Sequence, residues 1–213
     1  MKAITINGQV SCGSECVKVS KEQNTYNREA LIAAASSLFQ KQGFAATGVA
    51  QISEEAALTQ GGFYGHFKSK NLLVEAACRQ AMSNGRDSWR AMMGSAANDM
   101  ETLIDAYVSP EHVEAVAEGC PMAAYTCEIK SQDEAVKNTF TQGFEDMVAI
   151  LQEVLAGDFT DETARREALF FMCSMVGSVA MARATKTTNP ELADEIIAAT
   201  RENLKAVANS AGS

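Results

Sequence analysis

The residue types best suited to chemistry lie together in one short stretch, TQGGFYGHFKSK, at residues 59–70. It combines an amide, a phenol, an imidazole and two ammonium groups with three glycines. Phe63 and Phe67 are one helical turn apart, and Thr59 is a favourable N-cap in front of them, so the pattern predicts a helix. The glycines oppose that helix by roughly 3 kcal/mol in total. A helix of such poor intrinsic propensity needs a functional reason.

On a helical wheel the glycines gather on one side. Phe63 and Phe67 point toward a small core, whereas Gly61, Gly62 and Gly65 fall within an arc of about 100° on the opposite side. A face without side chains lets another backbone approach closely. We therefore expect this face to lie against a double helix, with the two phenylalanines holding it in place. The alternative is a loose loop between two helices, which the aromatic pair and the Thr59 cap disfavour.

Polar side chains around this glycine face suit contact with DNA. Gln60 stands at the N-terminal end of the helix, where it can reach base edges, since amides pair well with adenine in the major groove. The other side chains are of types that reach phosphates, and helix N-termini add to such contacts. The residues expected at phosphates are Thr47, Thr59, Tyr64, His66 and Lys68.

Two helical patterns precede the stretch. The first covers about 27–42, where an apolar stripe ends at Gly43. The second covers about 48–56, is capped by Thr47, and buries Val49 and Ile52. Two short helices joined by a tight turn and braced by an earlier helix make up a helix-turn-helix.

The run from Asn27 to Leu73, above all GGFYGHFKSKNLL, resembles the N-terminal domain of the TetR family of bacterial transcriptional regulators. The resemblance implies a three-helix DNA-binding domain at residues 25–72, in which Gln60 and Gly61 approach bases. Two positions depart from the family pattern. Gly65 replaces a frequent aromatic residue, which removes one phosphate contact. Ala57 stands where many relatives carry the turn glycine, so about 1–2 kcal/mol of left-handed strain is expected there.

Composition is that of a soluble all-α protein. Of the 213 residues, 46% are hydrophobic and 21% are charged, which excludes disorder, and apolar residues recur at three-four spacing almost throughout. The net charge of −9 is uneven, since residues 1–85 carry +2 and the remainder carries −11. An acidic chain with its basic residues concentrated at one end remains compatible with nucleic acid.

The sequence indicates a cytoplasmic protein without a membrane span. The start of the chain is too polar for an export signal, and the most apolar run, 168–182, is shorter than the ~20 residues a bilayer requires. The six cysteines are not spaced as in a disulfide-stabilised protein, which is expected in a reducing compartment. Residues 1–24 read as a flexible tail, in which Cys12 and Cys16 lack further ligands for a metal. No metal site and no cofactor are expected.

Residues 73–213 are expected to form a larger helical domain for effector binding and dimerisation. A long helix from about 70 to 93 joins it to the DNA-binding domain. Further helices are expected at about 100–108, 111–118, 121–130, 133–156, 161–184 and 190–208. The last two carry many small residues: Gly177, Ser178, Ala180, Ala182, Ala193, Ala198, Ala199 and Ala206. In the TetR family such helices pair with their copies in a homodimer, although a core role for these residues is an alternative.

A homodimer would place two recognition helices near one DNA turn apart, on a pseudo-palindromic operator. An effector in the second domain, by tilting the connecting helix, would release the DNA. An apolar pocket is expected to use Trp89, Met93, Cys120, Met122, Tyr125, Phe144, Phe171 and Met175, each of which is equally suited to the core.

Cys120 precedes Pro121, which suits the first position of a helix, so the helix dipole is expected to lower the pKa of its thiol. Some TetR-like regulators that respond to electrophiles or oxidants look similar here. Cys120 is therefore either a reactive sensor or a small buried cap residue beside the pocket.

We predict a TetR-like repressor released by a small apolar or electrophilic molecule. No nucleophilic triad, phosphate loop or paired-histidine pattern is present, so an enzyme is not expected. The rival of a different class is a helical ligand-binding protein that has lost DNA binding, against which Gln60, Tyr64 and Lys68 argue.

Overall fold

A computed structural model of the chain describes residues 20–93, 99–157 and 160–211. Every regular element within these residues is helical, which confirms the all-α prediction. The elements are α1 (Lys21–Ala46), α2 (Val49–Glu55), α3 (Gln60–His66), α4 (Lys70–Met93), α5 (Asp99–Tyr107), α6 (Pro110–Glu114), α7 (Pro121–Tyr125), the 3₁₀-helix η1 (Ile129–Ser131), α8 (Glu134–Leu155), α9 (Asp161–Thr185) and α10 (Pro190–Ala211).

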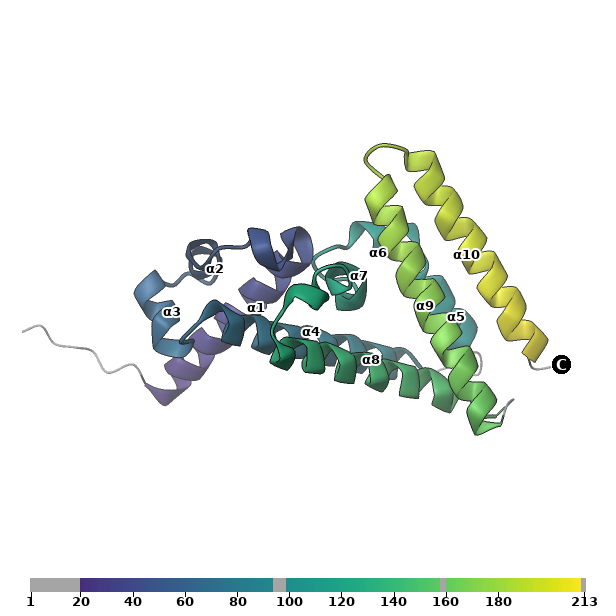
Figure 1. The fold of residues 1–213 in the computed structure, drawn as a ribbon, viewed down its shortest axis with the longest axis horizontal. Coiled ribbons are helices and arrows are strands. Elements are labelled where there is room, and N and C mark those ends of the chain that lie inside the picture. The colour runs from purple at the N-terminus through teal and green to yellow at the C-terminus, as the bar shows by residue number, and fades with distance from the viewer. Residues whose placement is uncertain (1–19, 94–98, 158–159, 212–213) are drawn as a thin grey trace, which may run out of the picture.

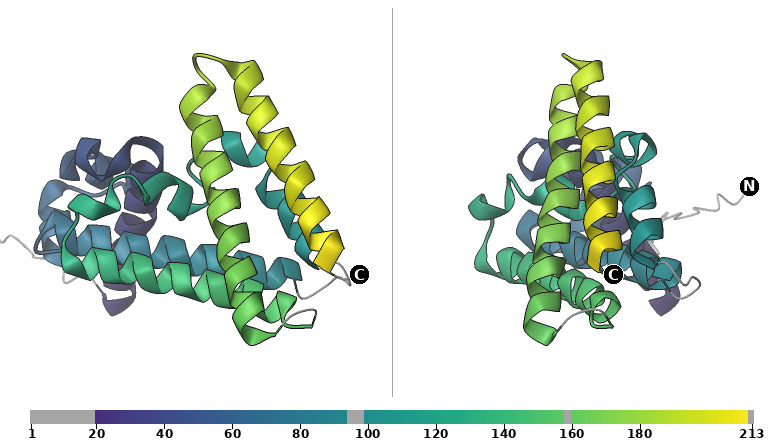
Figure 2. Two further views of the ribbon diagram at one scale, coloured as in Figure 1. Left: turned by 45° about the vertical axis from the view of Figure 1, so that its right-hand side comes forward. Right: turned by 90° about the vertical axis from the view of Figure 1, so that its right-hand side faces the viewer.

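The helices form an elongated molecule with two distinct ends (Figure 1). Helices α1, α2 and α3 make up one end, and α4 leads away from them alongside α8. At the other end α9 and α10 pack against each other, and both views in Figure 2 show them side by side. The expected boundary between residues 72 and 73 falls in the first turn of α4, so one continuous helix connects the two parts.

The N-terminal end is built as its apolar pattern predicts. Phe63 and Phe67 are buried together with Leu31, Phe39 and Ile52. Helix α1 starts earlier than expected, at Lys21, because the Ser20 hydroxyl accepts a hydrogen bond from the Gln23 amide at 3.1 Å and caps it. Residues 21–24 are thus helix and not tail, whereas Cys12 and Cys16 lie outside the described residues.

Gly43 interrupts α1 as predicted, at φ 85° and ψ 167°, although helical turns resume as far as Ala46. The conformation requires glycine for two reasons. Its φ lies where a Cβ is strained, and a Cβ would stand 2.1 Å from a carboxylate oxygen of Glu128.

Ala57 adopts the left-handed conformation expected from the missing turn glycine, with φ 55°. Because this conformation costs an L-residue about 1 kcal/mol, Ala57→Gly is expected to raise the free energy of unfolding by up to about that amount. Urea denaturation of the two proteins measures the difference. Ala50→Gly, in the regular part of α2, is the control and should lower stability instead. A destabilised Ala57→Gly variant would contradict the assignment of strain to this turn.

The helix expected over 121–130 is broken in the structure. Helix α7 ends at Tyr125 and a separate 3₁₀ turn follows, so the chain bends between them. The bend lets the Glu128 carboxylate reach the N-terminal end of the molecule, where it accepts a hydrogen bond from the Phe44 amide at 2.9 Å.

Helix α9 is, among the described residues, the one helix long and apolar enough to cross a membrane by length and composition, with a mean hydropathy of 1.4. Its apolar window is therefore longer than the run 168–182 suggested. In the structure α9 packs against both α8 and α10, and Phe171, Met172 and Met175 are buried in those contacts. One face of α9 thus packs in the core, and 39% of its apolar window is buried.

Candidate DNA interface and effector cavity

Helix α3 is held as the sequence pattern predicts. The Thr59 hydroxyl accepts a hydrogen bond from the Gly62 amide at 3.1 Å, which confirms Thr59 as the N-cap. Phe63 has no exposed surface, and its ring centroid lies 6.0 Å from that of Phe67. The Arg28 guanidinium carbon lies over the Phe67 ring, 4.9 Å from its centroid. A short, glycine-rich helix is thus fixed by one cap and two buried rings.

The glycines of α3 have no internal reason to be glycine. Their φ values are ordinary, since Gly43 is the one described glycine with a positive φ. A Cβ at Gly65 would meet nothing within 4 Å, and at Gly61 its nearest neighbour would be the Thr59 hydroxyl at 3.8 Å. A Cβ at Gly62 would make only ordinary contacts, the nearest at 3.5 Å. The glycine face therefore gives up helix propensity without any gain in packing within the chain.

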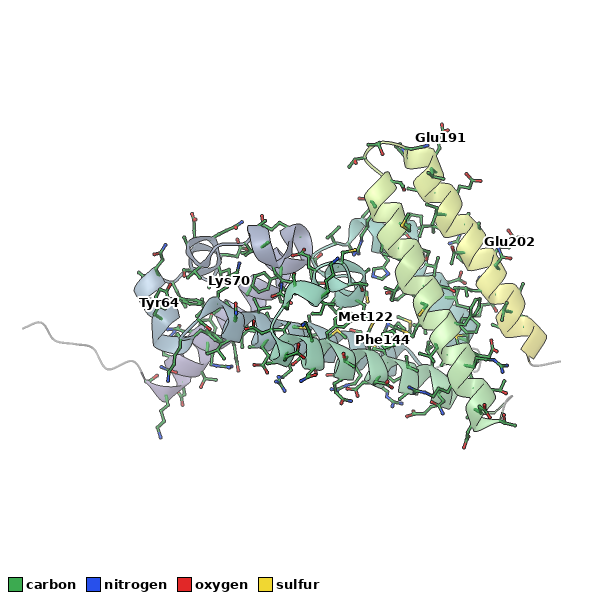
Figure 3. The ribbon with its side chains drawn as sticks, viewed as in Figure 1. Tyr64, Lys70, Met122, Phe144, Glu191 and Glu202 are labelled. Carbon is green, nitrogen blue, oxygen red and sulfur yellow. The ribbon has the colours of Figure 1, made fainter. Side chains whose placement is uncertain are left out.

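The polar residues predicted around this face lie at the outer end of the molecule. Gln60 and Lys68 are exposed and His66 is half-buried. Tyr64 is 61% exposed and its ring packs edge-on against Phe63 at 5.0 Å, so its hydroxyl is directed by a fixed ring. Figure 3 shows Tyr64 at the far end from α9 and α10.

Thr47 does not lie where the sequence suggested. It is 1% exposed, and its hydroxyl donates a hydrogen bond to the Gly43 carbonyl at 2.7 Å. The N-cap of α2 is Gly48, so the prediction that Thr47 caps this helix is wrong. The kink at Gly43 frees a carbonyl that a buried hydroxyl satisfies, and this leaves Thr47 unsuited to a phosphate contact through its side chain.

Several contacts tie the N-terminal end to the rest of the molecule. The Lys70 ammonium donates a hydrogen bond to the Phe44 carbonyl, next to the amide bound by Glu128. The Tyr125 ring lies 4.7 Å from the Phe44 ring. On the other side of the kink, the Gln40 amide donates to the Ala117 carbonyl at 2.9 Å. The end of α1 is therefore linked to the segment from Ala117 to Glu128 by two hydrogen bonds and a ring contact.

A cavity of about 900 Å³ lies between α1, α4 and the segment from α5 to α7. Of the predicted pocket residues, Trp89, Cys120 and Met122 line it. Tyr125, Phe144, Phe171 and Met175 do not, and the Met93 side chain lies outside the described residues. Tyr125 instead packs against Phe44, while Phe171 and Met175 belong to the core around α9. Figure 3 marks Met122 and Phe144 near the middle of the molecule.

The cavity wall contains residues that the sequence pattern did not indicate. Those that matter for its chemistry are Gln40, Met82, Met92, Tyr107, His112 and Met147. Gln40 belongs to α1, which sequence reasoning assigned wholly to the DNA-binding domain. The chain has two histidines, and His112 was the one without a predicted role. That fact could have marked it in the sequence as a candidate for the effector site.

Cys120 is a buried cap residue and not an activated thiol. Burial raises the pKa of the Cys120 thiol, and this outweighs the Tyr107 hydroxyl and the amides of Ala123 and Met122, which lower it. The predicted effect of the helix N-terminus is thus present but smaller than desolvation, so the expectation of a lowered pKa is wrong. The Tyr107 hydroxyl, although near this thiol, makes no hydrogen bond of normal geometry and is a buried unpaired group.

His112 is fixed as a neutral imidazole. Its Nδ1–H donates to the Tyr107 carbonyl at 2.7 Å, and its Nε2 accepts from the Cys120 amide at 3.0 Å, which leaves neither nitrogen free. Burial lowers the pKa of His112 below its ordinary value of 6.5, with Arg183 adding to the effect.

A lowered histidine pKa makes stability depend on pH in one direction. Its contribution is complete above the ordinary pKa and is lost as the pH falls through and below about 6.5, because the unfolded state then binds the extra proton. Urea midpoints measured between about pH 7 and pH 5 should fall more steeply for the natural protein than for His112→Gln, which keeps one donor and one acceptor. His66→Gln, at the other histidine, should retain the steep fall.

Comparison with known proteins agrees with this geometry. Residues 31–77 match the family model described as bacterial regulatory proteins, tetR family, and residues 96–193 match the C-terminal domain of LmrA/YxaF-like transcriptional regulators. The HTH-type transcriptional regulator LmrA of Bacillus subtilis is 23% identical over 182 residues, which cover 78% of this chain and 91% of LmrA.

Other relatives match over shorter stretches at higher identity. YerO of Bacillus subtilis, named an uncharacterized HTH-type transcriptional regulator, is 45% identical over 51 residues, which are 24% of this chain and 18% of YerO. TtgR of Pseudomonas putida is 42% identical over 60 residues, or 28% of this chain and 29% of TtgR. A TetR-family regulator from Agrobacterium tumefaciens has the same fold, with a TM-score of 0.72, 22% identity, and coverage of 86% of this chain and 98% of that one.

Proposed function

The chain belongs to the TetR family of bacterial regulatory proteins, and from this premise we propose that it represses transcription from a pseudo-palindromic operator until a small molecule releases it. It is an HTH-type transcriptional regulator and not an enzyme. Regulators of this family bind DNA and dimerise. The repressor role, the dimer interface, the effector and a cytoplasmic location belong to the proposal, as does the division into residues 25–72 for DNA and 73–213 for effector and partner.

The observation that carries the proposal is the glycine face of α3. Neither backbone conformation nor packing within the chain favours glycine at residues 61, 62 and 65, so the face is shaped for a partner outside the chain. Gln60 and Gly61 are assigned to bases. The residues assigned to phosphates are Thr59, Tyr64, His66 and Lys68, whereas Thr47 is left out because its hydroxyl is buried.

The proposed dimer uses the outer faces of α9 and α10. Phe170, Gly177 and Met181 follow one another at helical spacing on the side of α9 opposite its buried residues, and Phe170 and Met181 are 48% and 57% exposed. On α10, Leu192, Ala199 and Ala206 recur every seven residues and are exposed. Large exposed apolar side chains aligned on two adjacent helices are typical of a four-helix dimer interface.

Some of the small residues expected at that interface belong to the core instead. Ser178, Ala182 and Ala193 are at most 6% exposed and lie on the inner faces of the two helices. The members of the predicted set that retain at least partial exposure are Gly177, Ala180, Ala198, Ala199 and Ala206, of which Gly177 and Ala180 are half-buried.

Effector release is proposed to act through the shared wall of the cavity. Six of its residues, at 29, 32, 33, 36, 37 and 40, lie on α1 of the DNA-binding end, so a bound molecule touches that helix directly. Gln40 is three residues from the kink at Gly43, where Glu128 and Lys70 hold the next turn. A ligand that binds one position of α1 better than the other shifts the distance between the two α3 helices of a dimer.

The test of the proposed function is selection of bound fragments from a random DNA pool with the purified protein at low salt. A palindromic consensus is the expected result, with half-sites about one helical turn or a small multiple apart. Enrichment of no sequence would overturn the proposal and leave the rival class, a ligand-binding protein without DNA binding.

Lys68→Ala is expected to weaken binding about equally for all DNA sequences. The ammonium contacts a phosphate in the proposal, so its loss should reduce the slope of log affinity against log salt by about one. Titrations of the selected operator and of a scrambled duplex at several salt concentrations measure both effects. Gln60→Ala is the matched comparison, and should instead reduce the preference for the operator by about 1–3 kcal/mol.

A further inference from the structure

The charged residues that line the cavity are all acidic. They are Glu29 on α1, Glu111 on α6 and Glu118 before α7, and no lysine or arginine is among the lining residues. All three are exposed, so they lie where the cavity meets solvent. Among the described residues none of the three forms an ion pair, whereas the neighbouring Glu114 pairs with Lys186. The histidine in the wall is neutral, with both ring nitrogens occupied.

The remaining wall suits an apolar body with a positive charge. Trp89 and Tyr107 pack edge-to-face, with ring centroids 5.7 Å apart, and both line the cavity beside Met82, Met92 and Met147. Aromatic faces attract cations, and thioethers adapt to irregular apolar shapes. Arg183 does not line the cavity, and its guanidinium donates to the carbonyls of His112 and Val113 at 2.8 and 3.1 Å.

We infer that the effector of this cavity is an apolar molecule carrying a protonated amine, whose body packs against Trp89 and Tyr107 while the carboxylates at the opening attract its charge. The inference rests on the proposed effector role of the cavity and names the class of ligand. It ranks three forms of one molecule: the amine binds best, the neutral alcohol less well, and the carboxylate least, since an anion meets three like charges at the opening.

The experiment uses three probes with one apolar body: phenylbutylamine, phenylbutanol and phenylbutyrate. Trp89 is the single tryptophan of the chain and lines the cavity, so its fluorescence reports binding at this site in the full-length protein. We expect the amine to bind about tenfold more tightly than the alcohol, and the carboxylate more weakly than both. Equal affinities, or tightest binding of the carboxylate, would overturn the inference, as would no fluorescence change with any of the three.

Two variants with the same change of net charge locate the effect. Glu111→Gln combined with Glu118→Gln should lower the affinity for the amine about three- to tenfold and leave the alcohol unchanged. Glu55→Gln combined with Glu162→Gln, at exposed positions outside the lining, should change neither affinity. If both pairs act alike, the preference reflects overall charge and the inference is wrong. None of these outcomes depends on DNA binding, so failure here and failure of the DNA selection are distinguished.

Discussion

Replacing Gly61 with leucine is expected to stabilise the folded protein and at the same time to remove tight operator binding. Leucine favours a helix over glycine by up to about 1 kcal/mol, and a Cβ at this position would have no neighbour in the chain closer than 3.8 Å. On the DNA side the new side chain would occupy the space into which the proposed duplex fits. A loss of about 3 kcal/mol, or roughly a hundredfold in affinity, is expected.

Both halves of this result are needed, because a loss of binding alone could come from damage to the fold. Thermal unfolding of Gly61→Leu should show an unchanged or raised Tm, while titration with the selected operator shows the loss. Gly61→Ala should lie between the natural protein and the leucine variant. Glu55→Leu is the control, because it adds a similar apolar side chain on α2. A carboxylate at this position would repel phosphates, so we do not expect Glu55 to contact DNA, and the variant should retain operator affinity. Tight binding by Gly61→Leu would remove the glycine face from the proposed interface.

The DNA-binding end could be predicted closely because its signals are local. A cap, two aromatic residues one turn apart and three glycines on one arc all lie within nine residues, and the structure confirms the helix they define. The strain at Ala57 followed in the same way from one missing glycine. The prediction for Thr47 was wrong because it considered only the residue type and its place before a helix. A threonine before a helix is a good cap by type, but the kink at Gly43 brings a free carbonyl within 2.7 Å of its hydroxyl.

The cavity was harder to predict because its wall comes from segments far apart in the chain. Apolar periodicity marks a buried residue, yet Phe171 and Trp89 look alike in the sequence and only the latter borders open space. Gln40 could not be recognised as a cavity residue, because a polar residue on the first helix is expected to be exposed. It is buried by its contact with Ala117, which lies far away in the sequence. The behaviour of the Cys120 thiol likewise depends on burial, which the sequence around Pro121 does not encode.

Substituting aspartate for both Phe170 and Met181 is expected to convert the proposed dimer to a monomer and to weaken operator binding by a factor of about 10² to 10⁴. In a two-fold interface each position occurs twice, so the double substitution removes four large apolar side chains, each worth about 1.5–3 kcal/mol when buried. The four new carboxylates would also repel one another in the interface. Once the dimer dissociates, the two half-sites of the operator are bound by separate monomers, which weakens binding. Sedimentation velocity measures the first effect, and operator titration measures the second.

The control for this prediction is Leu72→Asp, because Leu72 is as exposed as Phe170 at 48% but lies on α4, away from α9 and α10. Its sedimentation should remain that of a dimer. If the Phe170 and Met181 double variant remains dimeric, the partner surface lies elsewhere on the molecule, and the exposed apolar residues of α9 need a different occupant.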